Sequence, residues 1–382
     1  MEKPVYLDFN ATTPVDPRVL EAMLPFLTSR YGNASSTHAY GYEAREAVDV
    51  ARRSVAALIG ASAKEIVFTG GGSETDNLAI LGTVLPRLDR HPHVIASAIE
   101  HPAVLNTLAY LRHRFGVEYT LAPVDETGQV RVDAIGEVLR PETVLITVMH
   151  ANNEVGTLQP VREISRFTRD AGVVLHVDAA QSAGKVPIDV DDLGIDLLAI
   201  AGHKLYAPKG IGALYMRQGI TLDPLIHGSG QEGGMRAGTE NVAGIVALGA
   251  ACRLAREDLD AETKRLTALR DRLQAILLAE IPDLQINGHP ENRLPNTLNV
   301  SFPGAAGLMV LSVATDVAAS TGSACHSGQA NPSPVLLSMG AAPERARGAV
   351  RLSLGRMSTP DDVERAGASL VDAYRQVAMA MA

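Results

Sequence analysis

The sequence AIAGHKLYAPKGIG, residues 199–212, governs the interpretation of the whole chain. It continues an apolar run that starts at Leu197 and predicts a buried strand, and its proline and glycines predict turns after Ala201. His203 and Lys204 therefore follow a strand end, where ligands bind in open α/β sheets. A lysine shielded from water there has a lowered pKa, and its neutral amine can form a Schiff base with an aldehyde. A surface lysine that merely follows a strand is the alternative.

On both sides of this stretch, short apolar runs alternate with segments that are mostly long enough for a helix. The alternation is typical of βαβ units and predicts an α/β fold with a mainly parallel sheet. The predicted strands lie at residues 66–68, 94–97, 117–121, 144–149, 173–177, 197–201 and 213–216.

The pattern changes after about Asp258, which predicts a second, smaller domain. A charged helix is expected over Glu262–Leu278, then strands at Leu298–Phe302 and Arg351–Leu354, and a last helix from Pro360. We expect a large domain of residues 16–257. Residues 258–382, completed by residues 1–15, are expected to form an α+β domain.

Composition excludes several classes of function. The net charge is −9 and there is no long basic block, so nucleic acid is not an expected direct ligand. No apolar run approaches the roughly 18 residues of a membrane span, and the N-terminus lacks a signal pattern. With only Cys252 and Cys325, no disulfide framework is implied. We expect a cytoplasmic protein, and no metal site is expected.

Polar or reactive residue types follow five of the predicted strands: Ser73, His101, Asn152, Asp178 and Lys204. Each has an ordinary structural explanation when it is taken alone. The carboxyl ends of parallel strands meet at one edge of a sheet, so the five are expected to lie together. As a set they suit a phosphorylated pyridine aldehyde.

The sequence TGGGSET at residues 69–75 suits a phosphate, because glycines allow close approach and a helix N-terminus offers free N–H groups. A tight strand-to-helix turn would have the same composition. Asp178 suits a protonated pyridine nitrogen, although an aspartate there can also cap a helix. Gln181 and Asn152 have the chemistry to hydrogen-bond a phenolic oxygen.

Two later features add a nucleophile and an anion site. The small, polar segment ASTGSACHSG at residues 319–328 predicts a mobile loop that displays Cys325 as an accessible thiol. Cys252 lies in an apolar helical run and is expected in the core. Arg351 interrupts an apolar strand, where its guanidinium fits a substrate carboxylate or, alternatively, a structural salt bridge.

In this order the motifs resemble those of the NifS/IscS-type cysteine desulfurases, in the class V aminotransferase group of pyridoxal 5'-phosphate (PLP) enzymes. The resemblance extends from about Tyr6 to Arg356. Its stretches are Tyr6-Leu7-Asp8, Ala11-Thr12-Thr13-Pro14, Glu74 with Asp76-Asn77, Glu100-His101, Met149-His150, Asn152-Asn153-Glu154, His176-Val177-Asp178, Gln181-Ser182, Gly202-His203-Lys204, Pro208-Lys209-Gly210, Gly234-Met235-Arg236, Gly238-Thr239 and Gly322-Ser323-Ala324-Cys325.

The resemblance implies a type I PLP-dependent aminotransferase fold and a homodimer. It implies that L-cysteine is converted to L-alanine, with the sulfur held as a persulfide on Cys325 and passed to an acceptor protein such as an iron–sulfur scaffold, or used in tRNA or DNA thiolation. A selenocysteine lyase, an ordinary class V aminotransferase and a sulfur-relay partner without turnover are the alternatives.

The resemblance also implies a role for each matching residue. Lys204 matches the Schiff-base lysine, and His101 matches the histidine stacked on the cofactor ring. Asp178 and Gln181 match the partners of the pyridine nitrogen and of the ring 3-oxygen. The implied phosphate ligands are Gly72, Ser73, His203 and, across a homodimer interface, Thr239. The implied residues on the substrate side are Asn33, Asn152, which also counts as cofactor-binding, and Arg351.

Two departures from the family pattern bear on the site. Ala201 stands where the family usually has a serine that binds the phosphate, and Asn33-Ala34 stands where the family usually has Asn-Pro. The long stretch between Cys325 and Arg351 resembles the long-loop branch of the family, whose cysteine can swing outward.

Overall fold

The computed structural model describes residues 3–322 and 331–381. Its centre is a seven-stranded sheet with the order β2-β8-β7-β6-β5-β3-β4, in which only β8 runs against the other strands. The strands are β2 (Ile66–Thr69), β3 (His93–Ser97), β4 (Glu118–Ala122), β5 (Thr143–Met149), β6 (Val174–Asp178), β7 (Leu197–Ala201) and β8 (Gly212–Met216). The predicted strands are therefore confirmed to within about a residue at each end, and the fold class is α/β.

The register of the sheet aligns the strand ends that the sequence singled out. Met149 pairs with Asp178, and Asp178 pairs with Ala199, so β5, β6 and β7 end side by side. Gly212, the first residue of β8, pairs with both Ala201 and Thr69. The carboxyl ends of β2 and β7 thus flank the start of β8, at the same edge of the sheet.

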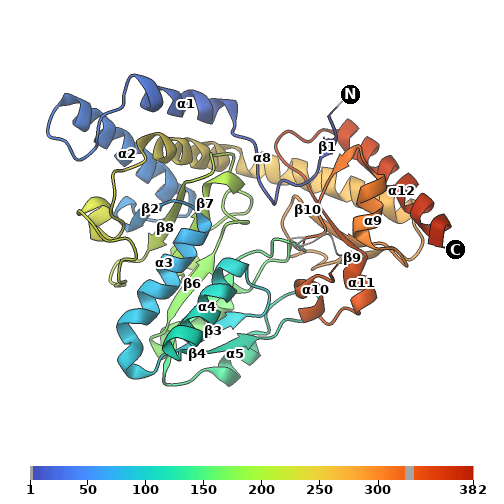
Figure 1. The fold of residues 1–382 in the computed structure, drawn as a ribbon, viewed down its shortest axis with the longest axis horizontal. Coiled ribbons are helices and arrows are strands. Elements are labelled where there is room, and N and C mark those ends of the chain that lie inside the picture. The colour runs from blue at the N-terminus through green and yellow to red at the C-terminus, as the bar shows by residue number, and fades with distance from the viewer. Residues whose placement is uncertain (1–2, 323–330, 382) are drawn as a thin grey trace.

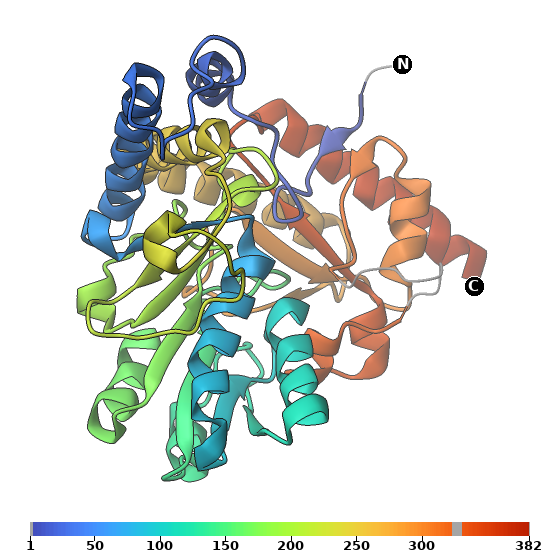
Figure 2. The same cartoon turned by 60° about the vertical axis from the view of Figure 1, so that its left-hand side comes forward.

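Helices cover both faces of this sheet (Figures 1 and 2). The helices of the described residues are α1 (Pro17–Thr28), α2 (Ala39–Leu58), α3 (Gly72–Val84), α4 (Pro102–Phe115), α5 (Val132–Val138), α6 (Val161–Ala171), α7 (Val190–Leu193), α8 (Val242–Glu280), α9 (Gly307–Val313), α10 (Pro334–Ser338), α11 (Pro343–Arg347) and α12 (Pro360–Met381). Side chains alternate along the strands. Ile66 and Phe68 therefore join the core under α2 and α8, and Val67 joins the core under α3 and α4.

A separate core lies at the other end of the molecule. It contains Val5 and Leu7 from the N-terminal segment together with side chains of α9, α12 and the second half of α8. Its three-stranded antiparallel sheet has the order β12 (Ala349–Ser353), β10 (Thr297–Ser301) and β9 (Gln285–Asn287). Nearby, β1 (Val5–Tyr6) pairs in parallel with β11 (Val317–Ala318), so the start of the chain lies beside its C-terminal third.

Helix α8 differs from the expectation. The two predicted helical segments, Ile245–Cys252 and Glu262–Leu278, are parts of one helix of 39 residues. The charged stretch between them contains good helix formers and neither proline nor glycine, so nothing stops the helix. Figure 1 shows α8 running from the seven-stranded sheet to the second core. The boundary expected near Asp258 falls inside this helix.

None of the helices in the described ranges combines the length and the apolar character that crossing a membrane requires.

Candidate active site

A cavity of about 640 Å³ opens at the edge of the sheet where the aligned strands end. It is lined from one side by residues that follow β2, β3, β6 and β7, and from the other by Ser320, Gly322 and Arg351. Eight of the residues expected at the site line it: Gly72, Ser73, His101, Asp178, Gln181, His203, Lys204 and Arg351.

Lys204 ends a short turn, Gly202–Lys204, that directly follows β7. Its Nζ donates to the carbonyl oxygens of Asn10 at 2.5 Å and Ala11 at 2.8 Å. Burial, followed by the nearby charge of Arg351, lowers the pKa of Lys204 to about 8. The surface-lysine alternative is therefore wrong, and a substantial fraction of this amine is neutral at mildly alkaline pH.

Asp178 ends β6 as a buried carboxylate. Its Oδ1 accepts a hydrogen bond from the Ala180 N–H at 2.8 Å, which orients the side chain within the turn that follows. Burial raises the pKa of Asp178, and the hydrogen bond from the Ala180 N–H and the charge of Lys204 oppose that rise. A cationic partner in the cavity would offset the burial and favour the ionised carboxylate.

Asp76 and Glu100 are two further buried carboxyl groups near Asp178, and sequence reasoning had used them only as motif matches. Burial raises the pKa of Glu100 to about 8. Burial and the neighbouring charges of Asp178 and Glu100 raise the pKa of Asp76 well above its usual value. Asp76 Oδ1 lies 3.6 Å from His176 Nε2, and neither atom has a hydrogen-bond partner among the described residues. Asp76 stands among the buried residues of α3, and an acidic residue in such a helix is the sequence feature that could have indicated its role.

A cradle for an anion lies where α3 begins. Gly71 has a φ of +143°, and the N–H groups of the first turn of α3 have no partner within the helix. A Cβ at Gly72 would come within 3.1 Å of the Ala201 Cβ, and a Cβ at Gly212 would lie 2.9 Å from the Gly71 backbone. Only glycine keeps this surface open, so the residues present fit a phosphate group.

Two imidazole rings border the cavity in a neutral state. Burial and the neighbouring lysines lower the pKa of His203 to about 4, and its Nδ1 lies 3.2 Å from Thr12 Oγ1. His101 begins α4, and its Nδ1 accepts from the Ala103 N–H at 3.1 Å, which leaves the proton on Nε2. Burial lowers the pKa of His101 as well. Neither ring is thus charged near neutral pH.

Gln181 lies in the turn after β6 and is almost fully buried. Its Nε2 donates to the Asn10 carbonyl at 2.9 Å, and its Oε1 accepts from Lys185 Nζ at 3.0 Å. The Asn10 carbonyl thus accepts hydrogen bonds from both Gln181 and Lys204. The N-terminal segment therefore holds two of the predicted site residues, a contact that local sequence patterns do not reveal.

Arg351 combines features of both interpretations offered for it. One guanidinium nitrogen lies 2.7 Å from Asp8 Oδ1, which is a salt bridge, and another donates to the Asn153 carbonyl at 3.0 Å. Its Nε is buried and has no hydrogen-bond partner within residues 3–322 and 331–381. The side chain nevertheless lines the cavity, so it stands beside any molecule bound there.

Three predicted site residues do not line the cavity of this chain. Asn152 is fully buried, and its Oδ1 accepts from the N–H groups of Glu154 and Val155 at 2.8 and 3.0 Å. Asn33 is exposed in the loop before α2, and Thr239 is exposed in the loop before α8. Cys325 lies outside the described residues. Cys252 is fully buried, as expected, and burial raises the pKa of its thiol to about 12.

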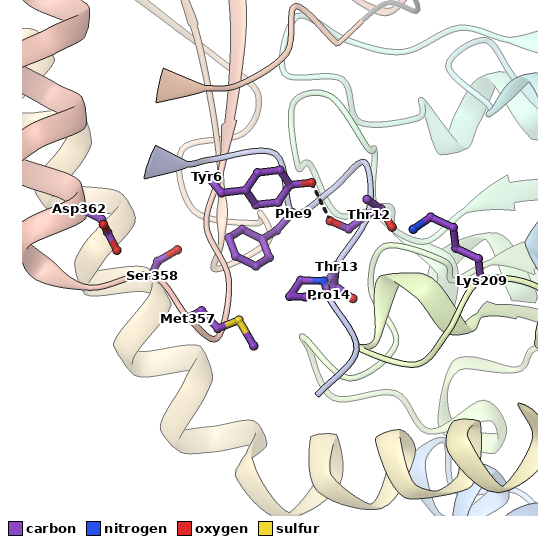
Figure 3. Close-up of a pocket in the computed structure, with 9 residues that line it drawn as sticks. All are labelled: Tyr6, Phe9, Thr12, Thr13, Pro14, Lys209, Met357, Ser358 and Asp362. Atoms are coloured by element: carbon purple, nitrogen blue, oxygen red, sulfur yellow. Dashed lines mark hydrogen bonds between the residues drawn. The ribbon is translucent and has the colours of Figure 1, made fainter. Parts of the chain in front are cut away.

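A second cavity, of about 410 Å³, is lined by the segment from Thr12 to Pro14. Figure 3 shows its aromatic wall of Tyr6 and Phe9, with the Tyr6 hydroxyl donating to the Thr12 carbonyl at 3.0 Å. Lys209 lines both cavities. Of the described residues that line this second cavity, Lys209 and Asp362 are the charged ones, and none is a strand-end residue of the kind that lines the larger cavity.

Comparisons with known proteins agree with this geometry. The model of the family described as Aminotransferase class-V matches residues 5–366. The cysteine desulfurase IscS of Anaeromyxobacter dehalogenans (strain 2CP-C) is 48% identical over 369 residues, which cover 96% of this chain and 91% of the relative.

Solved structures give the same result. A structure titled as a NifS-like protein superposes with a TM-score of 0.90 at 36% identity, covering 97% of this chain and 98% of that one. A structure of SspA in complex with cysteine gives a TM-score of 0.81 at 38% identity, covering 91% and 98%. The resemblance seen in the motifs is confirmed, and the chain belongs to the class-V aminotransferase family, among its PLP-dependent cysteine desulfurases of the NifS/IscS type.

Proposed function

We propose that this protein is an L-cysteine desulfurase, which converts L-cysteine to L-alanine and transfers the sulfur to an acceptor protein. The observation that carries the proposal is the placing of Lys204, with its lowered pKa, in one cavity with Asp178 and the glycine cradle of α3. The relatives support it, since they are named cysteine desulfurases and SspA was solved with cysteine.

The lining residues fit PLP as the resident cofactor. Gly72, Ser73 and His203 would hold its phosphate, and Asp178 would hold its protonated ring nitrogen. His101 would lie against the face of the ring. When bound, PLP supplies an aldehyde carbon that reacts with amines and a ring that withdraws electrons from the substrate Cα.

Lys204 would act as the proton carrier of the reaction. The carbonyl groups of Asn10 and Ala11 fix the position of its Nζ, and burial keeps part of the amine population neutral. A neutral Nζ can take the proton from the Cα of cysteine and later return it. Arg351 would orient the substrate by binding its carboxylate beside Asp8.

Cys325 would be the sulfur acceptor. Its thiolate would attack the substrate sulfur, so that an S–S bond forms while the Cβ–S bond breaks, and the electron pair left on Cβ takes up a proton to give alanine. This role rests on the sequence. It is supported by the position of Ser320 and Gly322, the described residues just before the segment, on the cavity wall.

The remaining assignments concern the assembly. Thr239 is exposed and does not line the cavity of its own chain, which supports the proposal that it serves the cofactor phosphate of a second copy in a homodimer. Asn33 and Asn152 are proposed to act on the substrate side. We propose two domains, residues 16–257 and residues 1–15 with 258–382, in a cytoplasmic enzyme that delivers sulfur to a protein such as an iron–sulfur scaffold.

The test is a single turnover of the PLP-loaded enzyme with cysteine, followed by alkylation and mass spectrometry. A mass gain of one sulfur atom should map to Cys325, and Cys325→Ala should stop before alanine is formed while still binding PLP. Cys252→Ala is the matched control and should form alanine as the unmodified enzyme does. Full alanine production by Cys325→Ala, or sulfur on Cys252, would contradict the proposal and favour a lyase or an aminotransferase.

A further inference from the structure

Lys185 is a partly buried lysine that the reaction described above does not use. It lies one turn beyond Gln181 in the segment after β6, and its Nζ donates to Gln181 Oε1 at 3.0 Å. No carboxylate of the described residues forms an ion pair with it. Burial and the charges of Lys204 and Arg351 lower the pKa of Lys185 to about 7. A partly buried lysine with no ion pair to a described carboxylate needs an explanation other than a structural salt bridge.

The backbone of Lys185 is held in place from two sides. Its N–H donates to the Ser182 carbonyl at 2.9 Å, within the turn that also contains Gln181. Its carbonyl accepts from Thr263 Oγ1 at 3.1 Å, and Thr263 belongs to α8. The side chain is therefore presented to Gln181 from a fixed base.

Hydrogen-bond chemistry then determines how the Gln181 amide is oriented. A lysine nitrogen donates in its charged state, and the neutral amine still has two N–H donors. The neutral amine can also accept through its lone pair, but the Asn10 carbonyl on the other side of the amide only accepts, so the Gln181 atom that faces Asn10 is the nitrogen and the atom that faces Lys185 is the oxygen. The NH₂ group must point the other way, where one hydrogen meets the Asn10 carbonyl at 2.9 Å. The second hydrogen is left for the cavity that Gln181 lines.

We propose that Lys185 is a positioning residue, which holds the Gln181 amide with its NH₂ group, rather than its oxygen, directed at the phenolic oxygen of bound PLP. The inference rests on the proposed function, because it takes Gln181 as the partner of that oxygen. Asn10 alone is a weaker constraint, since its carbonyl is shared with Lys204 Nζ at 2.5 Å, and that contact changes whenever Lys204 moves.

Lys185→Met removes the donor while nearly keeping the shape of the side chain. It leaves Gln181 Oε1 buried without a partner, which favours rotation of the amide. Equilibrium dialysis of PLP against the apo-protein should then show about fivefold weaker binding, the equivalent of one typical hydrogen bond. The induced circular dichroism of the bound cofactor should fall as well, because a rotated amide no longer orients the ring.

A double-variant cycle separates this role from a general one. Gln181→Ala should weaken PLP by a similar factor, and adding Lys185→Met to Gln181→Ala should change nothing further. Lys209→Met is the matched control, because Lys209 is an exposed cation on the same cavity with no contact to Gln181. The fold-loss of PLP affinity caused by Lys209→Met should multiply with the fold-loss caused by Gln181→Ala, because the two residues act independently. Thermal unfolding of each apo-protein checks the fold, and Lys185→Gln, which permits either amide orientation, replaces Lys185→Met if the latter is unstable.

Three outcomes would overturn the inference. The first is unchanged PLP binding in Lys185→Met together with weaker binding in Gln181→Ala. The second is an equal loss from Lys185→Met with and without Gln181. The third is a Gln181→Ala variant that binds PLP normally. None of them touches the proposed function, which is tested separately by borohydride-stable attachment of PLP to Lys204 and by sulfur on Cys325.

Discussion

At the scale of single residues, the site depends on unequal protonation of groups that lie close together. Lys204 and Lys185 have lowered pKa values, Glu100 and Asp76 have raised ones, and His203 is neutral. Burial is the largest cause of each shift. The protein has therefore placed titratable groups where water cannot stabilise their charges, which is typical of catalytic sites rather than of structural ones.

The pKa of Lys204 can be measured by competitive labelling of the apo-protein with an amine reagent across pH. Only the neutral amine reacts, so labelling should rise with pH and reach its midpoint near 8. In the unfolded chain the midpoint should return to about 10.4. Arg351 lowers and Asp178 raises the pKa of Lys204, so Arg351→Ala should move the midpoint up and Asp178→Asn should move it down. Shifts of equal sign would show that these charges do not act on Lys204.

Ala201 offers a second prediction at this scale. The Ala201 methyl faces the glycine cradle, 3.1 Å from the position of a Cβ at Gly72, and lines the cavity. Ala201→Ser would add a hydroxyl beside the phosphate site and should tighten PLP binding by up to about 1 kcal/mol. Equilibrium dialysis of the apo-protein measures this change. Unchanged or weaker affinity would mean that another group already occupies the position.

At the scale of elements, sequence patterns locate strands better than the contacts between them. The central strands are continuous apolar runs because parallel sheets are buried on both faces, and this pattern survives in a single sequence. The continuity of α8 was missed, because a charged stretch looks like a boundary although it remains a good helix former. Asn10 and Asp8 were missed as supports of the site, since they meet Gln181, Lys204 and Arg351 only after folding; Asp8 and Arg351 are 343 residues apart. Lys185 was missed as well, although it lies only four residues from Gln181.

Gly322 connects β11 to the segment that carries Cys325, and its backbone explains why glycine is needed there. Its φ is +84°, and a Cβ would lie 2.7 Å from Glu154 Oε2. That oxygen also accepts from Ser333 Oγ at 2.6 Å, so Glu154 contacts described residues on both sides of the segment. Gly322→Ala would therefore add a clash to the ordinary strain of a left-handed residue.

Gly340→Ala is the matched control, because Gly340 has a φ of +80° and nothing within 4 Å of its added Cβ. We expect Gly340→Ala to reduce the free energy of unfolding by about 1 kcal/mol, from backbone strain alone. Gly322→Ala should reduce it by roughly twice as much, as measured by the denaturant midpoint. Equal losses in the two variants would mean that Glu154 moves aside freely.

At the scale of the whole molecule, the cavity lies between the two cores, and each core supplies part of its wall. Gly72, His101, Asp178 and Lys204 come with the seven-stranded sheet, whereas Arg351 comes from β12 of the second core. Four of the five strand-end residues, Ser73, His101, Asp178 and Lys204, were predictable as a group because sheet geometry brings them together, whereas Asn152 is buried and does not line the cavity. The contribution of the second core was predictable only through the family resemblance, since nothing in a local pattern places Arg351 of β12 in the same cavity as Asp178.

The last prediction concerns the proposed homodimer. If Thr239 serves the phosphate site of the partner copy, then a defect in Thr239 of one chain and a defect in Lys204 of the other chain fall in the same active site, and the second site of the dimer stays intact. Thr239→Glu places a carboxylate where it would repel a phosphate, on an exposed loop that tolerates the change. Lys204→Ala removes the amine from the cavity of its own chain. The homodimer of each single variant, Thr239→Glu or Lys204→Ala, should therefore release little sulfide from cysteine.

Mixing the two variants under conditions that exchange subunits should restore activity. In a mixed dimer, the chain with intact Lys204 receives Thr239 from its Lys204→Ala partner, so one of the two sites is complete. Random exchange makes half of the dimers mixed, and sulfide release should reach about a quarter of the unmodified level. The double variant Lys204→Ala/Thr239→Glu, mixed with a chain that has neither change, is the control, because it leaves no complete site in a mixed dimer. Absence of complementation in the first mixture would place Thr239 outside the partner's site.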